Sequence, residues 1–382
     1  MERQSGGVRM TGGLLEKTIR KMERSSRRIG AKSPHVAKEG VYDDARLDWW
    51  TSGFWPGMLW IAADLTGDAA YREAAWTYDE RMERLFLVPN RFHHDVGFQF
   101  LPTAVLKHRL TGDEDGRRRG LFAANFLAGR LNLAGGFLRA WNDVADPTAW
   151  NRNNAGWAII DSMMNLPLLF WASETSGDPR YRHIAAAHAD TVLRRFVRED
   201  GSVAHIASFD PATGDFLGWI GGQGFAPDSA WSRGAAWALY GFAVACRYTG
   251  EARYLEASRR VADFFLASVE ADGVPLWDFR VVPREGEPRD TSAASCAASG
   301  LIELAALLPP DEGEPYRDAA RRTLRALADG YAAWDDPNDE ALLRGGTGNK
   351  PAGQNVDVSL IYGDYFFLEA LAKLSGWKHR VF

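Results

Sequence analysis

The sequence predicts an all-α protein folded as an (α/α)6 barrel, a closed ring of six helical hairpins. Three observations lead to this prediction. Apolar residues recur with helical spacing along most of the chain, strand patterns are scarce, and one hairpin pattern repeats. In each repeat an apolar helix ends in a short turn, and an amphipathic helix rich in alanine and arginine follows. Such repeats bury their apolar faces only by stacking, and closure into a ring removes the exposed ends.

The chain begins with residues 1–12, which we expect to be loosely ordered. The first predicted helix spans residues 13–30, because its apolar side chains lie on one face and its arginines and lysines on the other. Residues 31–47 are polar, turn-like and without a period. We expect residues 13–382 to form a single domain.

Five hairpins follow in order, at residues 54–86, 97–131, 158–197, 234–269 and 292–334. In the first four, the turn reads Thr or Ser, then Gly, then Asp or Glu. The glycine closes one helix in the left-handed conformation, and the acid caps the next helix. The last apolar helix has no amphipathic partner after it, and the first helix has no apolar partner before it. Pairing these two closes the ring, whereas an open helical solenoid is the alternative.

The composition excludes several classes of protein. A net charge of −5 argues against a nucleic-acid partner, which requires a surplus of lysine and arginine. No stretch is long and apolar enough to span a membrane, and the first thirty residues lack the apolar core of a secretory signal. We therefore expect a cytoplasmic protein. Cys246 and Cys296 lie in alanine-rich runs, which predicts small buried residues and no disulfide or zinc site.

Polar and aromatic residues collect where the chain enters the inner helices, and in a closed ring these entry segments open on one mouth. The segments contain Asp48-Trp49-Trp50, His93-His94-Asp95, Trp141-Asn142, residues 151–154, Trp157, Asp161, Asp228, Trp231, Arg233, Trp237, Asp290, Asp357, Tyr362 and Asp364. Polar groups among aromatic walls are typical of a small-molecule pocket. Flat indole faces stack on sugar rings, carboxylates supply acid and base, and the chain has 15 tryptophans.

Asp161 is the candidate general acid. It lies near the start of an apolar, helix-like run, residues 157–174, with no neighbour in sequence that neutralises it. Desolvation raises the pKa of a carboxyl group, as a general acid working near neutral pH requires. The alternative is a structural role as an N-terminal helix cap, where aspartate is also favoured.

Arg233 indicates the kind of ligand. With Trp231 and Trp237 around it, its guanidinium is suited to bind a planar carboxylate through two hydrogen bonds, which suggests an acidic sugar. An ion pair with Asp228 is the alternative.

The cluster His93-His94-Asp95 raises the question of a metal. Adjacent residues on a helix point in different directions, and no second motif in the sequence supports zinc. We predict no metal and no other cofactor.

Several long segments resemble the unsaturated glucuronyl hydrolases of glycoside hydrolase family 88. They include D-W-W-T-S-G-F-W-P-G-M-L-W, H-H-D-V-G-F, I-I-D-S-M-M-N-L-P-L-L-F-W-A-S-E and D-S-A-W-S-R-G-A-A-W-A-L-Y-G-F, in the family's order between about Trp49 and Leu371. The resemblance implies the same barrel and a hydrolase that removes 4,5-unsaturated uronic acid from oligosaccharides left by polysaccharide lyases. In this family the acid protonates C4 of the vinyl ether, water adds at C5, and the hemiketal rearranges to release the sugar.

The resemblance also implies residue roles. Asp161 corresponds to the acid/base, and Asp95 to a second essential carboxylate that orients the sugar ring through its hydroxyl groups. The implied substrate contacts and wall residues are His205, Gln223, Arg233, Trp237, Trp50, Trp141 and His94. From the entry segments listed above, Trp231 and Tyr362 complete the candidate substrate-binding residues. The implied partner is an unsaturated uronic-acid oligosaccharide, and we expect a monomer or a weak homodimer.

The parent polysaccharide stays open. Members that prefer sulphated fragments resemble one another in having serines shortly before a lysine in a late loop. Here Gly345, Gly346 and Gly348 precede Lys350, which favours unsulphated fragments. The nearest alternative is the related unsaturated rhamnogalacturonyl hydrolase family, with the same barrel and chemistry. More distant alternatives are another α/α-barrel sugar enzyme and a helical-repeat binding protein.

Overall fold

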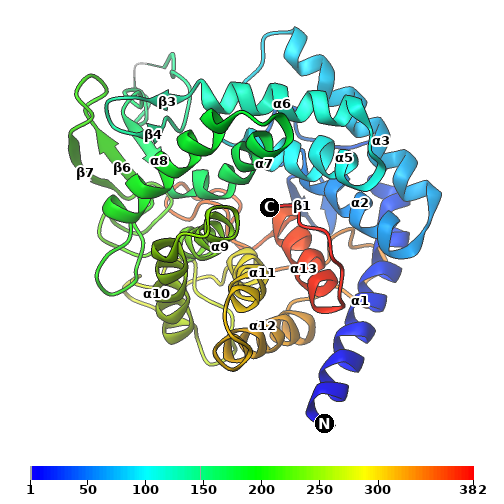
Figure 1. The fold of residues 1–382 in the computed structure, drawn as a ribbon. Coiled ribbons are helices and arrows are strands. Elements are labelled where there is room, and N and C mark those ends of the chain that lie inside the picture. Colours follow the sequence, from blue (N-terminus) through cyan, green and yellow to red (C-terminus); the bar gives the residue numbers. More distant parts are fainter. Residues whose placement is uncertain (1, 147) are drawn as a thin grey trace.

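The computed structural model describes residues 2–146 and 148–382 and forms a closed ring of paired helices (Figure 1). The inner helices are α2 (Phe54–Thr66), α4 (Val96–Phe100) continued by α5 (Leu106–Thr111), α7 (Leu166–Ser176), α9 (Ser232–Thr249), α11 (Thr291–Leu307) and α13 (Ile361–Leu374). The outer helices are α3 (Ala69–Glu83), α6 (Glu114–Ala128), α8 (Pro179–Arg195), α10 (Ala252–Ser268), α12 (Pro310–Gly330) and α1 (Glu2–Ile29). Helix α13 contacts α11, α2 and α1, so the ring closes. The predicted (α/α)6 barrel is confirmed, and the open solenoid is excluded.

The glycine turns end the inner helices as predicted. Gly67, Gly112, Gly177 and Gly250 all have φ between +73° and +75°, the left-handed conformation that glycine adopts without strain. The side chains of Asp68, Asp113 and Asp178 then accept a hydrogen bond from a backbone N–H in the first turn of the outer helix. Glu251 occupies the same position before α10 but makes no such bond.

The N-terminal segment differs from the expectation. Helix α1 begins at Glu2, so the backbone of residues 2–12 is helical where the sequence predicts a loose end. A helix that is already nucleated and packed over residues 14–29 extends at little further cost. This end projects beyond the ring (Figure 1).

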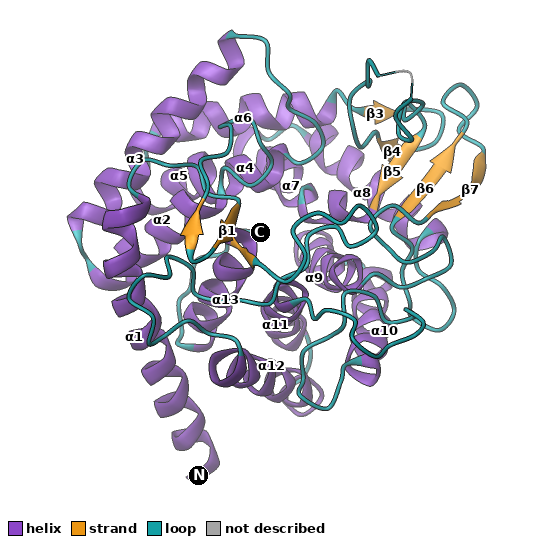
Figure 2. Ribbon diagram, turned by 180° about the vertical axis from the view of Figure 1, so that it is seen from behind, coloured by secondary structure: helices purple, strands orange, loops and turns teal. Residues whose placement is uncertain are grey.

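Three small sheets were not predicted. They consist of β1 (Val36–Lys38), β2 (Val41–Tyr42) and β8 (Ser359–Leu360); of β3 (Leu131–Asn132) and β4 (Phe137–Leu138); and of β5 (Trp157–Ile159), β6 (Ile206–Phe209) and β7 (Phe216–Ile220). All pairs are antiparallel. Strands this short give no readable alternation in the sequence. Figure 2 shows the strands β3 to β7 at the edge of the helical ring and β1 near its middle.

The run that contains Asp161 is not one helix, which corrects the sequence interpretation. Strand β5 is followed by a 3-10 turn, η3 (Ile160–Met164), and α7 begins only at Leu166. Pro167 explains the late start, because proline fits the first turn of a helix but disfavours α-helix before it. Two other irregular turns, η1 (Arg84–Leu87) and the π-helical η2 (Leu101–Val105), complete the elements.

Both cysteines are buried and free, as predicted. Among the described residues, no helix has both the length and the apolar character needed to cross a bilayer.

Residues after α13 turn back into the ring, whose centre they fill (Figure 1). Phe382 is 0% exposed, and its ring lies 5.6 to 5.9 Å from the rings of Phe98, Tyr365 and Phe366. The main-chain oxygen of Phe382 accepts a hydrogen bond from Arg247 on α9. Phe382 thus packs against aromatic side chains of α4 and α13.

We expect Phe382→Ala to lower the free energy of unfolding by about 3 to 5 kcal/mol, because it opens a cavity in a fully buried aromatic layer. Urea denaturation of both proteins measures this loss. Phe382→Leu, which keeps most of the buried volume, should lose clearly less. An alanine variant as stable as the parent protein would contradict this role.

Candidate active site

A cavity of about 310 Å³ opens at the mouth of the ring. Its lining includes His35, Trp49, Trp50, His93, Asp95, Trp141, Asn151, Ile159, Asp161, Gln223, Trp231, Arg233, Gly348, Asn349, Gln354, Asn355 and Tyr362. The loops before α2, α4, α9 and α13 all contribute, as expected for a mouth built from the entries to the inner helices. The structure therefore brings both candidate carboxylates into one cavity.

Asp161 lies in the 3-10 turn between β5 and α7, and its side chain is 15% exposed. Burial and, to a smaller extent, the negative charge of Asp95 raise the pKa of Asp161 to about 7, against the opposing effects of His94 and Arg233. Its Oδ2 has no hydrogen-bond partner among the described residues. A carboxyl group that holds its proton near neutral pH and has a free oxygen is suited to donate that proton to a ligand.

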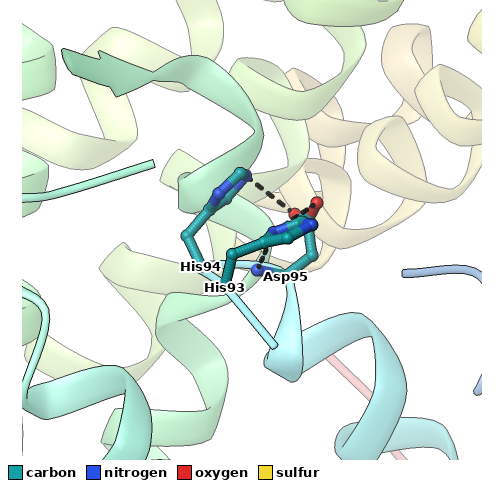
Figure 3. Close-up of side chains that lie close together, drawn as sticks. All are labelled: His93, His94 and Asp95. Carbon is teal, nitrogen blue, oxygen red and sulfur yellow. Dashed lines mark hydrogen bonds and ion pairs between the residues drawn. The ribbon is translucent and has the colours of Figure 1, made fainter. Parts of the chain in front are cut away.

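Asp95 differs from Asp161 because its surroundings stabilise the charge. Burial alone would raise the pKa of Asp95, but His94, His93 and Asn165 together lower it below the ordinary value. His94 Nε2 lies 2.9 Å from Asp95 Oδ1, and Asn165 Nδ2 donates to the same oxygen over 3.1 Å. His94 Nδ1, 2.7 Å from the carbonyl oxygen of Ala140, donates its proton there. His94 Nε2 is thereby turned towards Asp95 (Figure 3).

The geometry corrects the reason given against a metal. His93, His94 and Asp95 lie in the turn before α4 and not on a helix, and their ligand atoms lie within 4.8 Å of one another (Figure 3). The contacts give the two histidines another role, because with Asn165 they lower the pKa of Asp95 and orient its carboxylate. The prediction that no metal is needed remains a prediction, and no step proposed below uses one.

Asn165 connects the two carboxylates. Its Nδ2 donates both to the carboxylate of Asp95 and to the main-chain oxygen of Asp161, each over 3.1 Å. Its Oδ1 accepts from the backbone N–H of Phe98 over 2.8 Å. Because Asn165 is fully buried, this bridge fixes the α4 entry relative to the turn that contains Asp161. Asn165 belongs to the same sequence motif as Asp161, but the motif alone does not indicate this role.

His205 faces Asp161 across 3.7 Å, from Nε2 to Oδ2. The backbone N–H of Gln223 donates to His205 Nδ1 over 2.9 Å, and the carbonyl oxygen of Gly221 lies 3.2 Å from the same atom. The shorter contact favours the ring proton on Nε2. Burial lowers the pKa of His205 to about 3, so the ring stays neutral. The glycine at 222 makes this contact possible, because a Cβ there would lie 2.2 Å from His205 Nδ1. Neither facing atom has another hydrogen-bond partner among the described residues, which leaves both available to a ligand.

Arg233 is held by the protein itself. Its ion pair is with Asp290, while the predicted alternative partner, Asp228, is exposed to solvent. Its Nη1 also donates to the carbonyl oxygen of Thr347, and its Nη2 donates to Gln223 Oε1 and to the carbonyl oxygen of Gly348. The four Nη protons are thereby used within the protein, so the expected two-bond grip on a ligand carboxylate stays a prediction that requires some of these bonds to be exchanged. In the structure Arg233 fixes the late loop and supplies positive charge near Asp161.

Some of the remaining predicted substrate contacts line the cavity, and others are buried behind it. Trp50, Trp141, Gln223, Trp231 and Tyr362 line the cavity together with Asp95, Asp161 and Arg233. Trp50 and Tyr362 pack with ring centroids 4.9 Å apart, which makes one aromatic wall.

Trp237 does not line this cavity. It is 1% exposed and packs on Phe98 and Phe366 one layer below. His94 is likewise fully buried, behind Asp95.

Part of the cavity lining could not be predicted from the sequence. His35, Gln354 and Asn355 come from loops without a helical period, so no pattern singled them out. Pairing of β1 with β8 brings these two loops together, and Asn355 Nδ2 lies 3.5 Å from His35 Nε2. The amide groups of Gln223, Asn349 and Gln354 add neutral polar groups to the lining, next to the guanidinium of Arg233.

The glycines of the late loop are required by packing. A Cβ at Gly346 would lie 2.7 Å from Leu360 Cδ1, and a Cβ at Gly348 would lie 2.9 Å from Asn355 Cβ. Lys350, which follows, has its ammonium 3.8 Å from Glu287. The loop therefore has no room for serine side chains at these two positions in its present form.

Comparison with known proteins identifies the family of the chain. The profile of Glycosyl Hydrolase Family 88 matches residues 21–372. The unsaturated glucuronyl hydrolase of Bacillus sp. (strain GL1) is 42% identical over 359 residues, which cover 92% of this chain and 93% of that protein. The unsaturated chondroitin disaccharide hydrolase of Streptococcus pyogenes serotype M1 is 34% identical over 328 residues, 85% of this chain and 80% of that protein.

The fold agrees as well. The crystal structure of the unsaturated glucuronyl hydrolase from Bacillus sp. GL1 superposes with a TM-score of 0.89 at 39% identity, covering 94% of this chain and 96% of that one. A profile that matches most of the chain, together with relatives matched nearly end to end, shows the family. The chain belongs to glycosyl hydrolase family 88.

Proposed function

We propose that the protein removes 4,5-unsaturated uronic acid from the non-reducing end of oligosaccharides produced by polysaccharide lyases. The observation that carries this proposal is the pair of unlike carboxyl groups in one cavity, Asp161 with its pKa raised to about 7 and Asp95 with its pKa lowered. The unsaturated glucuronyl hydrolase of Bacillus sp. (strain GL1), 42% identical, supports the same activity.

In the proposed reaction Asp161 acts first as an acid and then as a base. The π electrons of the C4=C5 bond take its proton at C4, and the positive charge at C5 is shared with the ring oxygen. The Asp161 carboxylate then removes a proton from water as that water adds to C5. The resulting hemiketal opens to a ketone at C5 and a hemiacetal at C1, and the hemiacetal releases the remaining sugar as an alcohol.

The other residues bind and orient the substrate in this proposal. Asp95, held charged by His94 and Asn165, accepts hydrogen bonds from ring hydroxyl groups. The Nε2 proton of His205 faces Asp161 Oδ2 across 3.7 Å, so a ligand or water there contacts both. The indoles of Trp50 and Trp141 provide flat apolar faces for the sugar rings. The amide groups of Gln223, Asn349 and Gln354 offer neutral donors for the uronate carboxylate and hydroxyl groups.

The finer properties are proposed in the same way. Two late-loop glycines without room for a side chain, and Lys350 beside Glu287, support activity on unsulphated fragments without a strict need for sulphate. We expect a cytoplasmic monomer or weak homodimer that binds neither nucleic acid nor membranes.

A panel of unsaturated disaccharides from chondroitin, gellan and pectin lyases tests the function. Loss of ultraviolet absorbance, as the double bond disappears, should occur with the glucuronate-type fragments. Activity on the pectin-derived disaccharide alone would identify an unsaturated rhamnogalacturonyl hydrolase instead. Absence of activity on every unsaturated fragment would contradict the proposal.

We expect kcat/KM to fall as the pH rises through about 7, because the reaction needs Asp161 protonated in the free enzyme. The neighbouring His205, with its pKa lowered to about 3, should not contribute to this fall. Initial rates at low substrate concentration between pH 5 and 9 measure it. A rate that rises steadily through this range would show that an ionised Asp161 is the active form.

A further inference from the structure

An indole lies beyond the cavity, on the side of Trp141. Trp150 is 62% exposed, and its ring centroid lies 5.6 Å from that of Trp157 and 6.0 Å from that of Trp141. Trp141 lines the catalytic cavity, and so does Asn151, the residue after Trp150. Trp150 and Trp141 therefore pack against each other and against the buried Trp157, and this aromatic cluster reaches from the cavity to the outside of the molecule.

The loop that carries Trp150 is tied to the body of the protein. Asn154 is fully buried, and its Oδ1 accepts a hydrogen bond from Arg139 Nη2 over 2.7 Å. Its Nδ2 donates to the main-chain oxygens of Asn142 and Asn151, over 2.7 and 2.9 Å. Because these bonds close the loop on both sides of Trp150, the exposed indole is held beside the cavity before any ligand binds. A ligand that stacks on it does not have to order the loop first.

We propose that Trp150 is a sugar-binding platform for the unit that lies beyond those next to Asp161, in substrates longer than a disaccharide. An exposed flat indole, continuous with the cavity wall, fits the apolar face of a pyranose ring and requires no charge on that ring. This inference rests on the proposed function and adds to it a preference for chain length. The expected occupant is a further, neutral or acidic, sugar of the same oligosaccharide.

Kinetics with two substrates of one repeating unit test the platform. An unsaturated disaccharide and an unsaturated tetrasaccharide, made by the same lyase, are compared in the parent protein and in Trp150→Ala. We expect Trp150→Ala to lower kcat/KM for the tetrasaccharide about tenfold, mainly through KM, and to leave the disaccharide unchanged. Trp150→Phe, which keeps a flat ring, should recover most of the loss.

Trp219→Ala is the matched control, because Trp219 is a partly exposed indole (38%) on β7 that does not line the cavity. It should change neither substrate's kinetics. Equal losses for both substrates in Trp150→Ala, or no loss for either, would contradict the platform. A parent protein inactive on every unsaturated oligosaccharide would instead contradict the proposed function, so the two failures are distinguishable.

Discussion

Asp161→Asn is expected to lower kcat by about a thousandfold or more while the protein stays folded. Asparagine has nearly the same shape but neither donates a proton to C4 nor removes one from water, and general acid–base catalysis commonly contributes factors of this size. Stopped or continuous absorbance assays with the best disaccharide of the panel measure the loss. Near-normal turnover in this variant would defeat the assignment of Asp161.

The same variant should be more stable than the parent protein at alkaline pH. The folded-state pKa of Asp161, about 7, lies above the ordinary value near 3.9, so the unfolded chain ionises first as the pH rises. The parent fold therefore loses stability progressively between about pH 4 and pH 7, and the loss is complete above that range. Asp161→Asn avoids the buried charge, and we expect a gain on the order of 3 kcal/mol at pH 8 that narrows towards pH 5. Urea denaturation at both pH values measures the difference.

Asp95→Asn is expected to lower kcat/KM about a hundredfold, with the larger share in KM. Loss of the charge removes a strong acceptor for ring hydroxyl groups and weakens the contact with His94, because hydrogen bonds to charged groups are among the strong ones. The charge of Asp95 also helps to raise the pKa of Asp161, so its removal should move the alkaline fall of the pH profile to lower pH. If the fall in kcat/KM occurs at the same pH in Asp95→Asn as in the parent protein, the charge of Asp95 does not affect the pKa of Asp161.

Asp364→Asn provides a control for that experiment. Burial also raises the pKa of Asp364 to about 7, but its oxygens accept hydrogen bonds from Tyr42 and from the backbone N–H groups of Leu342 and Leu343, outside the cavity. Asparagine has only one acceptor oxygen, so we expect about 1 to 3 kcal/mol of destabilisation. The pH profile of the remaining activity should keep its shape. The two variants thus separate a catalytic effect from a structural one.

The ring could be predicted from the sequence because its determinants are local. Each glycine turn, such as that at Gly67, needs a left-handed residue and an acid directly after it, and both are visible as neighbours in the chain. Apolar spacing then distinguishes inner helices from outer ones. The same reasoning failed at residues 157–164, because pairing of β5 with β6 is a contact between segments far apart in the chain. Pro167 was the one local signal that α7 begins late.

The sequence predicted many of the residues in the candidate site but not their hydrogen-bond and ion-pair partners. Asp95 and Asp161 could be identified because polar residues directly before an apolar helical run are recognisable from the sequence alone. The partners of Arg233 were not visible, since Asp290 and the carbonyl groups of Thr347 and Gly348 are brought to it by the fold. His35 and Gln354 were missed for the same reason. What the fold adds is which charges are already satisfied and which atoms remain free for a ligand.

The central claim is that the enzyme hydrates an enol ether and does not cleave the glycosidic bond directly. The most direct test uses an unsaturated uronide in which a methylene group replaces the glycosidic oxygen. This compound keeps the C4=C5 double bond but has no C1–O bond to break. We expect the parent protein to remove the ultraviolet absorbance of this methylene analogue and the Asp161→Asn variant to leave it unchanged. If the parent protein consumes the natural disaccharide but leaves the methylene analogue unchanged, the mechanism proposed for this site is wrong.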